Sequence, residues 1–157
     1  LIKLESFNST STVTNLLAAG FRARVSDVEA FLFDSEIPVL TEPSLALKID
    51  GFVKPLSGFS SGWLKETPQL LKGLTRGEGK KRYIEFGVRN NIAADLFKWK
   101  VRNDDQLPQS QRRGEITDHQ TRNYPEATEY IGEHFVECFA IKDNVCIARA
   151  RQNVKII

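Results

Sequence analysis

The chain has 157 residues, of which 41% are hydrophobic, including ten phenylalanines and two tryptophans. A chain of this length and composition can bury a core of its own, so disorder is not the default expectation. Its 22 basic and 20 acidic residues give a formal net charge of +2, which argues against a dedicated nucleic-acid coat protein but leaves room for a local basic pocket that takes a small anion.

We expect no secretory signal at the start of this sequence. Residues 1–5 lack the basic and then apolar plan of a secretory signal, and no run of 18 apolar residues occurs anywhere, so we expect no membrane span. The sequence contains no methionine, even at its first position. We therefore expect a piece of a longer polypeptide. It would be one cytoplasmic domain over residues 1–157, covalently attached to a further domain upstream.

The first part of the chain mixes helix and strand signals. A short apolar stretch that ends in glycine, residues 16–20, predicts one or two helical turns. Residues 21–33 indicate one or two strands. Ser44–Val53 predicts a clearer strand, because its apolar residues alternate with other residues.

The middle of the chain passes from loops to strands. Residues 54–80 are rich in glycine and proline, and only Trp63–Leu74 has enough leucine for a short helix, which Pro68 interrupts or starts. Arg82–Val88 predicts a strand. Asp95–Arg102 is the best strand candidate of the whole sequence.

The last third predicts a polar excursion followed by a hairpin. Residues 104–125 are polar and contain two prolines, so we expect a long loop there. Residues 129–157 predict two strands paired around Lys142-Asp143-Asn144, and a last stretch, 153–157, that closes the sheet. The whole pattern indicates a mostly-β fold, a sandwich or a barrel. We predict an immunoglobulin-like β-sandwich with long loops and one or two short helices.

Two cysteines flank the expected turn. With a two-residue loop, Cys146 opposes Ile141 and Cys138 opposes Arg149, which puts the two sulfurs on opposite sheet faces, where no disulfide can form. A three-residue loop makes them diagonal neighbours, which is also a poor arrangement for a bridge. We expect buried thiols in a reducing compartment.

The strand over residues 97–103 divides into two faces. One face is mainly apolar and the other is basic: Phe97, Trp99, Val101 and Asn103 share the first, and Lys98, Lys100 and Arg102 share the second. The first interpretation is an aromatic row in the core with a solvated basic face behind it. The second is that Trp99 and Asn103 line a ligand pocket, where the indole stacks on a base and the carboxamide pairs with a base edge.

Two further segments carry polar groups that suit a ligand. Arg113 followed by Gly114 lets a planar guanidinium meet phosphate oxygens where the backbone comes close, although a solvated loop would look the same. If 126–138 is one strand, Thr128, Tyr130 and His134 lie on one face. A hydroxyl, a phenol and an imidazole set side by side suit a polar planar ligand, and the alternative is a histidine with a structural role.

In chain order, these motifs resemble one family. They are Trp99-x-Val101-x-Asn103, Arg113-Gly114, the alternating series Glu126-x-Thr128-x-Tyr130-x-Gly132-x-His134-x-Val136-x-Cys138, then Asn144-x-Cys146-x-Ala148-Arg149 and Val154-x-Ile156. Together they resemble the adenylyl/guanylyl and SMODS C-terminal sensor domain family. The resemblance covers residues 82–157, and residues 1–81 match only loosely, as the strands expected upstream.

This resemblance implies a ligand-sensing role in bacterial anti-phage systems built on nucleotide second messengers. The family is fused behind nucleotidyltransferases or to effector domains, and it is expected to recognise a nucleotide or cyclic oligonucleotide, to need no cofactor and to regulate the attached domain. Carried over, Arg113 would meet phosphate, Tyr130 or Trp99 would stack on a base, and His134 and Thr128 would bond to sugar or phosphate. Where the family tends to have Asn-Thr-Gly, this chain has Asn103-Asp104-Asp105.

Other functions have weaker support in the sequence. A protein-binding immunoglobulin-like module remains the main alternative, and the oligomeric state is open. A nuclease of the PD-(D/E)xK kind could use Asp50 and Glu85, but Gly87 stands where a further polar residue is needed. His119, His134, Cys138 and Cys146 match no zinc spacing, and no serine or cysteine lies in a nucleophile turn, so we expect neither a metal nor an enzyme with a complete active site.

Overall fold

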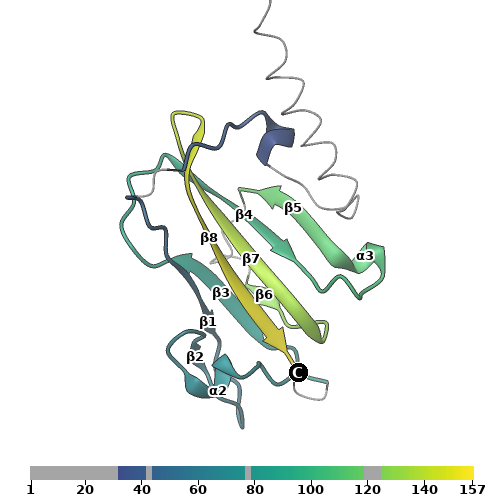
Figure 1. Cartoon of the computed structure of the whole chain (residues 1–157). Coiled ribbons are helices and arrows are strands. Elements are labelled where there is room, and N and C mark those ends of the chain that lie inside the picture. The colour runs from purple at the N-terminus through teal and green to yellow at the C-terminus, as the bar shows by residue number, and fades with distance from the viewer. Residues whose placement is uncertain (1–31, 42–43, 77–78, 119–124) are drawn as a thin grey trace, which may run out of the picture.

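The computed structural model describes residues 32–41, 44–76, 79–118 and 125–157. In these ranges, two four-stranded antiparallel sheets pack face to face (Figure 1). The helical turns expected at 16–20 and nearly all of the strand expected over 21–33 lie outside the described residues. Leu32 and Phe33 belong to a short 3-10 helix, so the prediction that this strand reaches Phe33 is wrong.

The strands of each sheet come from separate parts of the chain. The first sheet, in the order β2-β1-β3-β6, contains β1 (Ile49–Val53), β2 (Gly62–Trp63), β3 (Tyr83–Val88) and β6 (Glu126–Ala127). The second sheet, in the order β5-β4-β7-β8, contains β4 (Leu96–Arg102), β5 (Arg113–Thr117), β7 (Gly132–Lys142) and β8 (Val145–Ile156).

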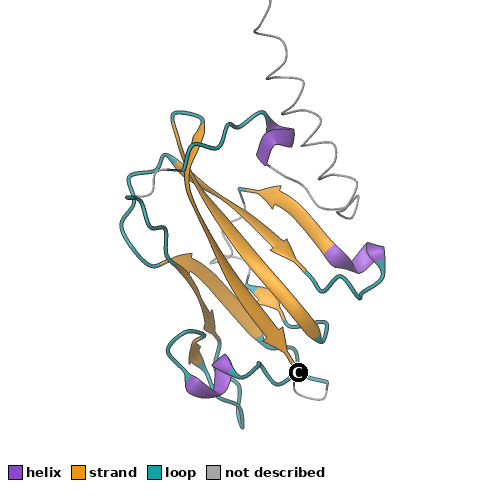
Figure 2. Cartoon of the chain, viewed as in Figure 1, coloured by secondary structure: helices purple, strands orange, loops and turns teal. Residues whose placement is uncertain are grey.

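Helices are few and short in the described ranges (Figure 2). They are η1 (Leu32–Ser35), α2 (Pro68–Leu71) and α3 (Gln109–Arg112). None of these is long and apolar enough to cross a membrane. The predicted mostly-β sandwich with short helices is confirmed.

The main core lies between the two sheets because alternate residues of each strand point inward. Ile84 and Phe86 of β3 face Val136 and Cys138 of β7 in one apolar cluster. Phe139 and Ile141, which alternate with these inward residues along β7, belong to a second cluster on the other side of the second sheet. This second cluster consists of Leu32, Ile37, Phe139, Ile141 and Cys146.

The β7–β8 hairpin turns at Asp143 and Asn144, which both have positive φ, 50° and 59°, as two-residue hairpin loops require. Cys146 opposes Ile141, as predicted. Ile147 is then an extra residue in β8, so Cys138 opposes Ala150 and not the predicted Arg149.

Both thiols are buried, unbridged and placed in the two separate clusters, as the two-residue loop predicts. Burial raises the pKa of each thiol above its usual range, so neither sulfur is activated as a nucleophile.

The strand predicted over Ser44–Val53 begins only at Ile49. The neighbouring strand β3 ends at Val88. Beyond it, the Asn90 side chain forms hydrogen bonds with the backbone of the residues that precede β1. Its Oδ1 accepts from the Lys48 amide at 2.8 Å and its Nδ2 donates to the Ala46 carbonyl at 2.7 Å. A side chain therefore replaces a strand partner at this point.

Two other expected elements are shorter or more divided than predicted. The helix expected over Trp63–Leu74 is a single turn that starts at Pro68, while Trp63 lies in β2. The excursion over 104–125 contains α3 and the edge strand β5. β5 was missed because its residues are mostly polar and its pairing with β4 includes a register shift.

Two of the three cations on the basic face of β4 are buried, contrary to the first interpretation, which expected a solvated face. Lys100 and Arg102 are only 3% and 2% exposed. Lys100 lies 3.4 Å from the Glu137 carboxylate on the neighbouring strand, and Arg102 bonds within the loop that follows β4. These partners offset the free-energy cost of removing the two cations from water.

The chain end does not form a separate strand, because 153–156 continue β8. The outer edge of β8 is covered at both ends by other segments. Cys146 exchanges backbone hydrogen bonds with Pro38 and Leu40, and Leu74 bonds to Lys155 and Ile157. These contacts cover part of an edge that would otherwise be open to pairing with another chain.

Substitutions at two neighbouring glycines, Gly51 and Gly87, test the packing of the core between the sheets. A Cβ on Gly51 would lie 2.7 Å from Ile84 and 2.8 Å from Phe86, whereas a Cβ on Gly87 would meet nothing within 4 Å. We expect Gly51→Ala to lower the free energy of unfolding by about 1–3 kcal/mol through overpacking. Gly87→Ala should leave that free energy nearly unchanged. Chemical denaturation of the two variants checks this, and equal losses would contradict the described core.

Candidate functional site

A hollow of about 250 Å³ opens at one end of the sandwich, between the ends of the two sheets. Its walls come from β3, β4, α3, β5, β6, β7 and β8 and from the segments after β4 and β6. The apolar part of the lining includes Ile84, Phe86, Val101, Val136, Val154 and Ile156. Polar side chains complete the lining, so the hollow combines an apolar wall with a few groups that can fix an orientation, as small-molecule sites do.

Five of the six predicted site residues line this hollow. They are Asn103, Arg113, Thr128, Tyr130 and His134. The sixth, Trp99, is 6% exposed and packs in the core. It borders a different hollow of about 540 Å³, together with Phe97 and Asp118. Of the two candidates for stacking on a base, Tyr130 is therefore the one placed at the first hollow.

The interpretation of 126–138 as one strand is wrong. β6 ends at Ala127 in the first sheet, and β7 begins at Gly132 in the second. The chain crosses between the sheets in the intervening residues, and Gly132 has φ 138°, which favours glycine. Thr128, Tyr130 and His134 still meet because this crossing lies at the end of the sandwich where the hollow opens.

His134 is held by Asn103. Its Nδ1 lies 3.2 Å from Asn103 Oδ1, and Asn103 Nδ2 donates to the Gln111 carbonyl at 2.7 Å. His134 is 7% exposed. Burial lowers its pKa, and the Tyr130 carbonyl and the carboxylates of Asp104 and Glu133 oppose that shift without cancelling it. The ring is therefore neutral at pH 7.

Thr128 is the most deeply buried of the five residues, at 1% exposed. Its Oγ1 accepts from the Arg82 amide at 3.0 Å, and its own amide donates to the Arg82 carbonyl at 2.9 Å. These bonds extend the β3–β6 pairing by one residue. The hydroxyl hydrogen is left over and can be donated.

Arg113 already has an anionic partner. Its Nη1 and Nη2 lie 2.5 Å and 3.3 Å from the two oxygens of Glu126. Burial alone would lower the pKa of Arg113, but the hydrogen bond and charge of Glu126, with a contribution from Glu115, raise it. The side chain is 43% exposed, so this ion pair lies at the mouth of the hollow and joins β5 of one sheet to β6 of the other.

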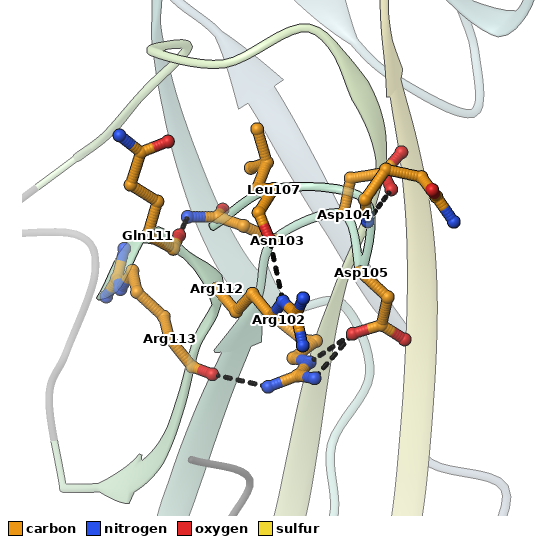
Figure 3. A network of polar contacts seen from close by, with 9 residues as sticks. Arg102, Asn103, Asp104, Asp105, Leu107, Gln111, Arg112 and Arg113 are labelled. Atoms are coloured by element: carbon orange, nitrogen blue, oxygen red, sulfur yellow. Dashed lines mark hydrogen bonds and ion pairs between the residues drawn. The ribbon is translucent and has the colours of Figure 1, made fainter. Parts of the chain in front are cut away.

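The loop that places Asn103 and Arg113 is organised around Arg102 (Figure 3). The Arg102 guanidinium donates to Asp105 Oδ1 from Nε, at 3.1 Å, and from Nη2. Its Nη1 donates to the Arg113 carbonyl at 2.8 Å. Asp105 serves here as the counter-ion of a buried arginine.

Asp104 fixes the same loop to the start of β7. Its Oδ1 accepts from the Gln106 amide at 2.8 Å and its Oδ2 from the Glu133 amide at 2.7 Å. These two bonds lower the pKa of Asp104. A Cβ on Gly132 would lie 2.4 Å from Asp104 Oδ2, so the contact depends on glycine at that position.

Several residues of the site could not be found by the sequence reasoning. Glu126 stood in the motif series without a role, and Arg102 was assigned to a solvated face. Gln111 offers no signal at all, because it contributes its backbone carbonyl to Asn103.

The two acids of the nuclease alternative have other partners. Asp50 accepts from the Gly51 and Lys65 amides at 2.8 Å and 3.3 Å, and Glu85 lies 2.7 Å from Lys54. Across the residues that the structure describes, no group of three His, Cys, Asp or Glu side chains is placed to hold a metal ion. His119 lies outside those residues.

Comparison with known families gives one match. The family described as the adenylyl/guanylyl and SMODS C-terminal sensor domain matches residues 32–157, which extends the resemblance seen in 82–157 toward the N-terminus. Comparison with curated proteins and with solved structures gave no match.

The Asp104 contacts predict how stability depends on pH. We expect Asp104→Asn to lower the free energy of unfolding at pH 7 by on the order of 1–2 kcal/mol, because the Glu133 amide then faces an NH₂ group or loses a charged acceptor. The folded pKa of Asp104 is lowered, so its contribution is present above the unfolded value of about 3.9 and is lost as pH falls through the folded value.

The difference between wild type and this variant should therefore shrink below about pH 4. Urea unfolding from pH 7 to pH 3 measures it. Asp118→Asn is the control, because Asp118 is 75% exposed and pairs with Lys98 at the surface. Equal stability of wild type and Asp104→Asn at pH 7 would contradict the described loop.

Proposed function

This chain belongs to the adenylyl/guanylyl and SMODS C-terminal sensor domain family, and from that membership we propose that its end hollow binds a nucleotide or cyclic oligonucleotide second messenger. In this proposal, binding regulates an attached nucleotidyltransferase or effector domain in a bacterial anti-phage system. The family is described as a sensor domain. The proposal adds the ligand class, the site and the regulated partner.

One observation carries the proposal more than any other. Five side chains chosen from the sequence as ligand candidates line a single hollow, although only Arg113 and His134 lie in strands, and the other three lie in segments between strands. A hydroxyl, a phenol, an imidazole, a carboxamide and a guanidinium around an apolar wall are the groups that bind a base, a sugar and a phosphate together.

The size of the hollow limits what enters it. At about 250 Å³ it lies just below the range of roughly 300–1,000 Å³ that is typical of small-molecule sites. In this proposal it takes no more than one nucleotide unit. A cyclic oligonucleotide would place one base inside and leave the rest of its ring over the mouth, where Arg113 lies.

The Arg113–Glu126 pair suggests how binding could be transmitted. A phosphate at the mouth competes with Glu126 for the same guanidinium. β6 has only two residues, and its described pairing is with β3. Loss of its ion pair to Arg113 would loosen β6 from the second sheet, which gives a ligand-dependent change next to the segment that connects the sheets.

Isothermal titration of the chain with cyclic di-, tri- and tetranucleotides tests the ligand class. We expect micromolar or tighter binding of at least one of them, and loss of that binding in the double variant Arg113→Ala/His134→Ala. Binding that is unchanged in this variant would remove the site assignment. A dimer whose interface covers the hollow, with no nucleotide binding, would favour the protein-interaction alternative.

Glu126 and Glu129 offer a matched pair of variants. Both line the hollow, but Glu126 pairs with Arg113 while Glu129 pairs with Lys81. If the phosphate meets Arg113, Glu126→Gln removes its competitor and should tighten binding roughly threefold to tenfold, whereas Glu129→Gln should change it little. The same titration measures both, and weaker binding by Glu126→Gln would place the phosphate elsewhere.

A further inference from the structure

His134 contains a buried atom with no partner. Among the described residues, its Nε2 is buried and has no hydrogen-bond partner. The same residue lines the end hollow. Buried polar atoms are nearly always paired, so this nitrogen, on a residue that lines the hollow, lacks a donor that a bound ligand can supply.

The contacts of Asn103 determine which nitrogen of the His134 ring carries the hydrogen. A backbone carbonyl only accepts, so the Asn103 atom that lies 2.7 Å from the Gln111 carbonyl must be the NH₂ nitrogen. The Asn103 oxygen is then the atom that faces His134 Nδ1 at 3.2 Å. Because this oxygen also only accepts, Nδ1 must carry the hydrogen.

The backbone holds Asn103 in this orientation. The Asn103 amide donates to the Arg112 carbonyl at 2.7 Å, so the residue is fixed at both its backbone and its side chain to the α3 segment. Burial keeps the imidazole neutral by lowering its pKa. A neutral ring with a hydrogen on Nδ1 presents a bare lone pair at Nε2.

The different exposures of His134 and Arg113 indicate which part of a ligand each of them would contact. His134 is 7% exposed and lies with the apolar wall, whereas the Arg113 side chain is 43% exposed at the mouth. A phosphate has only acceptor oxygens at neutral pH and cannot satisfy a lone pair. A nucleobase is planar, is largely apolar on its faces and carries N–H donors on its edge.

We infer that His134 is an acceptor that reads an N–H donor on the edge of a bound nucleobase, and that Asn103 is a positioning residue that fixes the tautomer needed for this. The inference rests on the proposed function and revises the expectation that His134 contacts phosphate. The phosphate belongs at the mouth, with Arg113.

The tautomer is tested first, on the free protein. Long-range ¹H–¹⁵N correlation spectra of the histidine rings at pH 7.5 should show His134 with hydrogen on Nδ1 and a deprotonated Nε2. In Asn103→Ala, which should remain folded by thermal unfolding, the ring should shift toward the Nε2–H tautomer that is common in solution. A hydrogen on Nε2 in the wild type would overturn the inference.

The ligand is tested next, with the four nucleoside 5′-monophosphates as probes. On binding, the ¹⁵N resonance of His134 Nε2 should move toward the value of a hydrogen-bonded nitrogen. The tightest binder is then compared with an analogue whose edge N–H is deleted or methylated, such as purine riboside 5′-monophosphate for adenosine 5′-monophosphate. We expect the analogue to bind at least about tenfold more weakly, because it leaves Nε2 unpaired.

The outcomes separate the two claims. Binding of a nucleotide with no change at Nε2, or equal binding of the analogue, overturns the role of His134 and leaves the proposed function standing. If neither the monophosphates nor the cyclic oligonucleotides bind, the proposed function fails, and the inference fails with it.

Discussion

The candidate site depends on the buried guanidinium of Arg102. Taking an arginine out of water is costly unless its donors are satisfied, and in this chain they are satisfied by Asp105 and by the Arg113 carbonyl. These bonds draw the two ends of the loop together. Asn103, which follows Arg102 directly, and Arg113 are thereby brought to the same hollow. The loop is long, but its ends have little freedom, which is what a preformed binding site requires.

The two sheets contribute different chemistry to that hollow. The second sheet supplies His134 and, through the loop after β4, its partner Asn103. The first sheet supplies Glu126 from β6 and Thr128 directly after it. A ligand held between them would touch both sheets at their ends. A sensor built in this way can report binding through the relative position of the sheets.

The strands with clear alternation, such as Asp95–Arg102 and the final hairpin, could be predicted from the sequence because their pattern follows from burial. The site residues were chosen partly for a reason that the structure contradicts. Thr128, Tyr130 and His134 were assigned to one strand, but they are brought together by a crossing between sheets that no local pattern encodes. β5 was hidden because an edge strand needs little apolar character. The pairing of Arg113 with Glu126 could not be predicted either, since it depends on the distance between two sheets.

The extra residue Ile147 in β8 has a consequence for changes in chain length. The bulge it forms lies between the turn and the part of β8 that lines the hollow, and the pairs on its two sides, Ile141 with Cys146 and Ala140 with Ala148, are already in step. Deleting Ile147 would therefore close the ladder into a regular hairpin and leave every later side chain on its present face. Deleting a residue nearer the end of the strand would reverse the faces beyond it and turn Val154 and Ile156 away from the hollow. The bulge is thus the point in this hairpin where the chain can shorten by one residue without altering the wall that a ligand would meet.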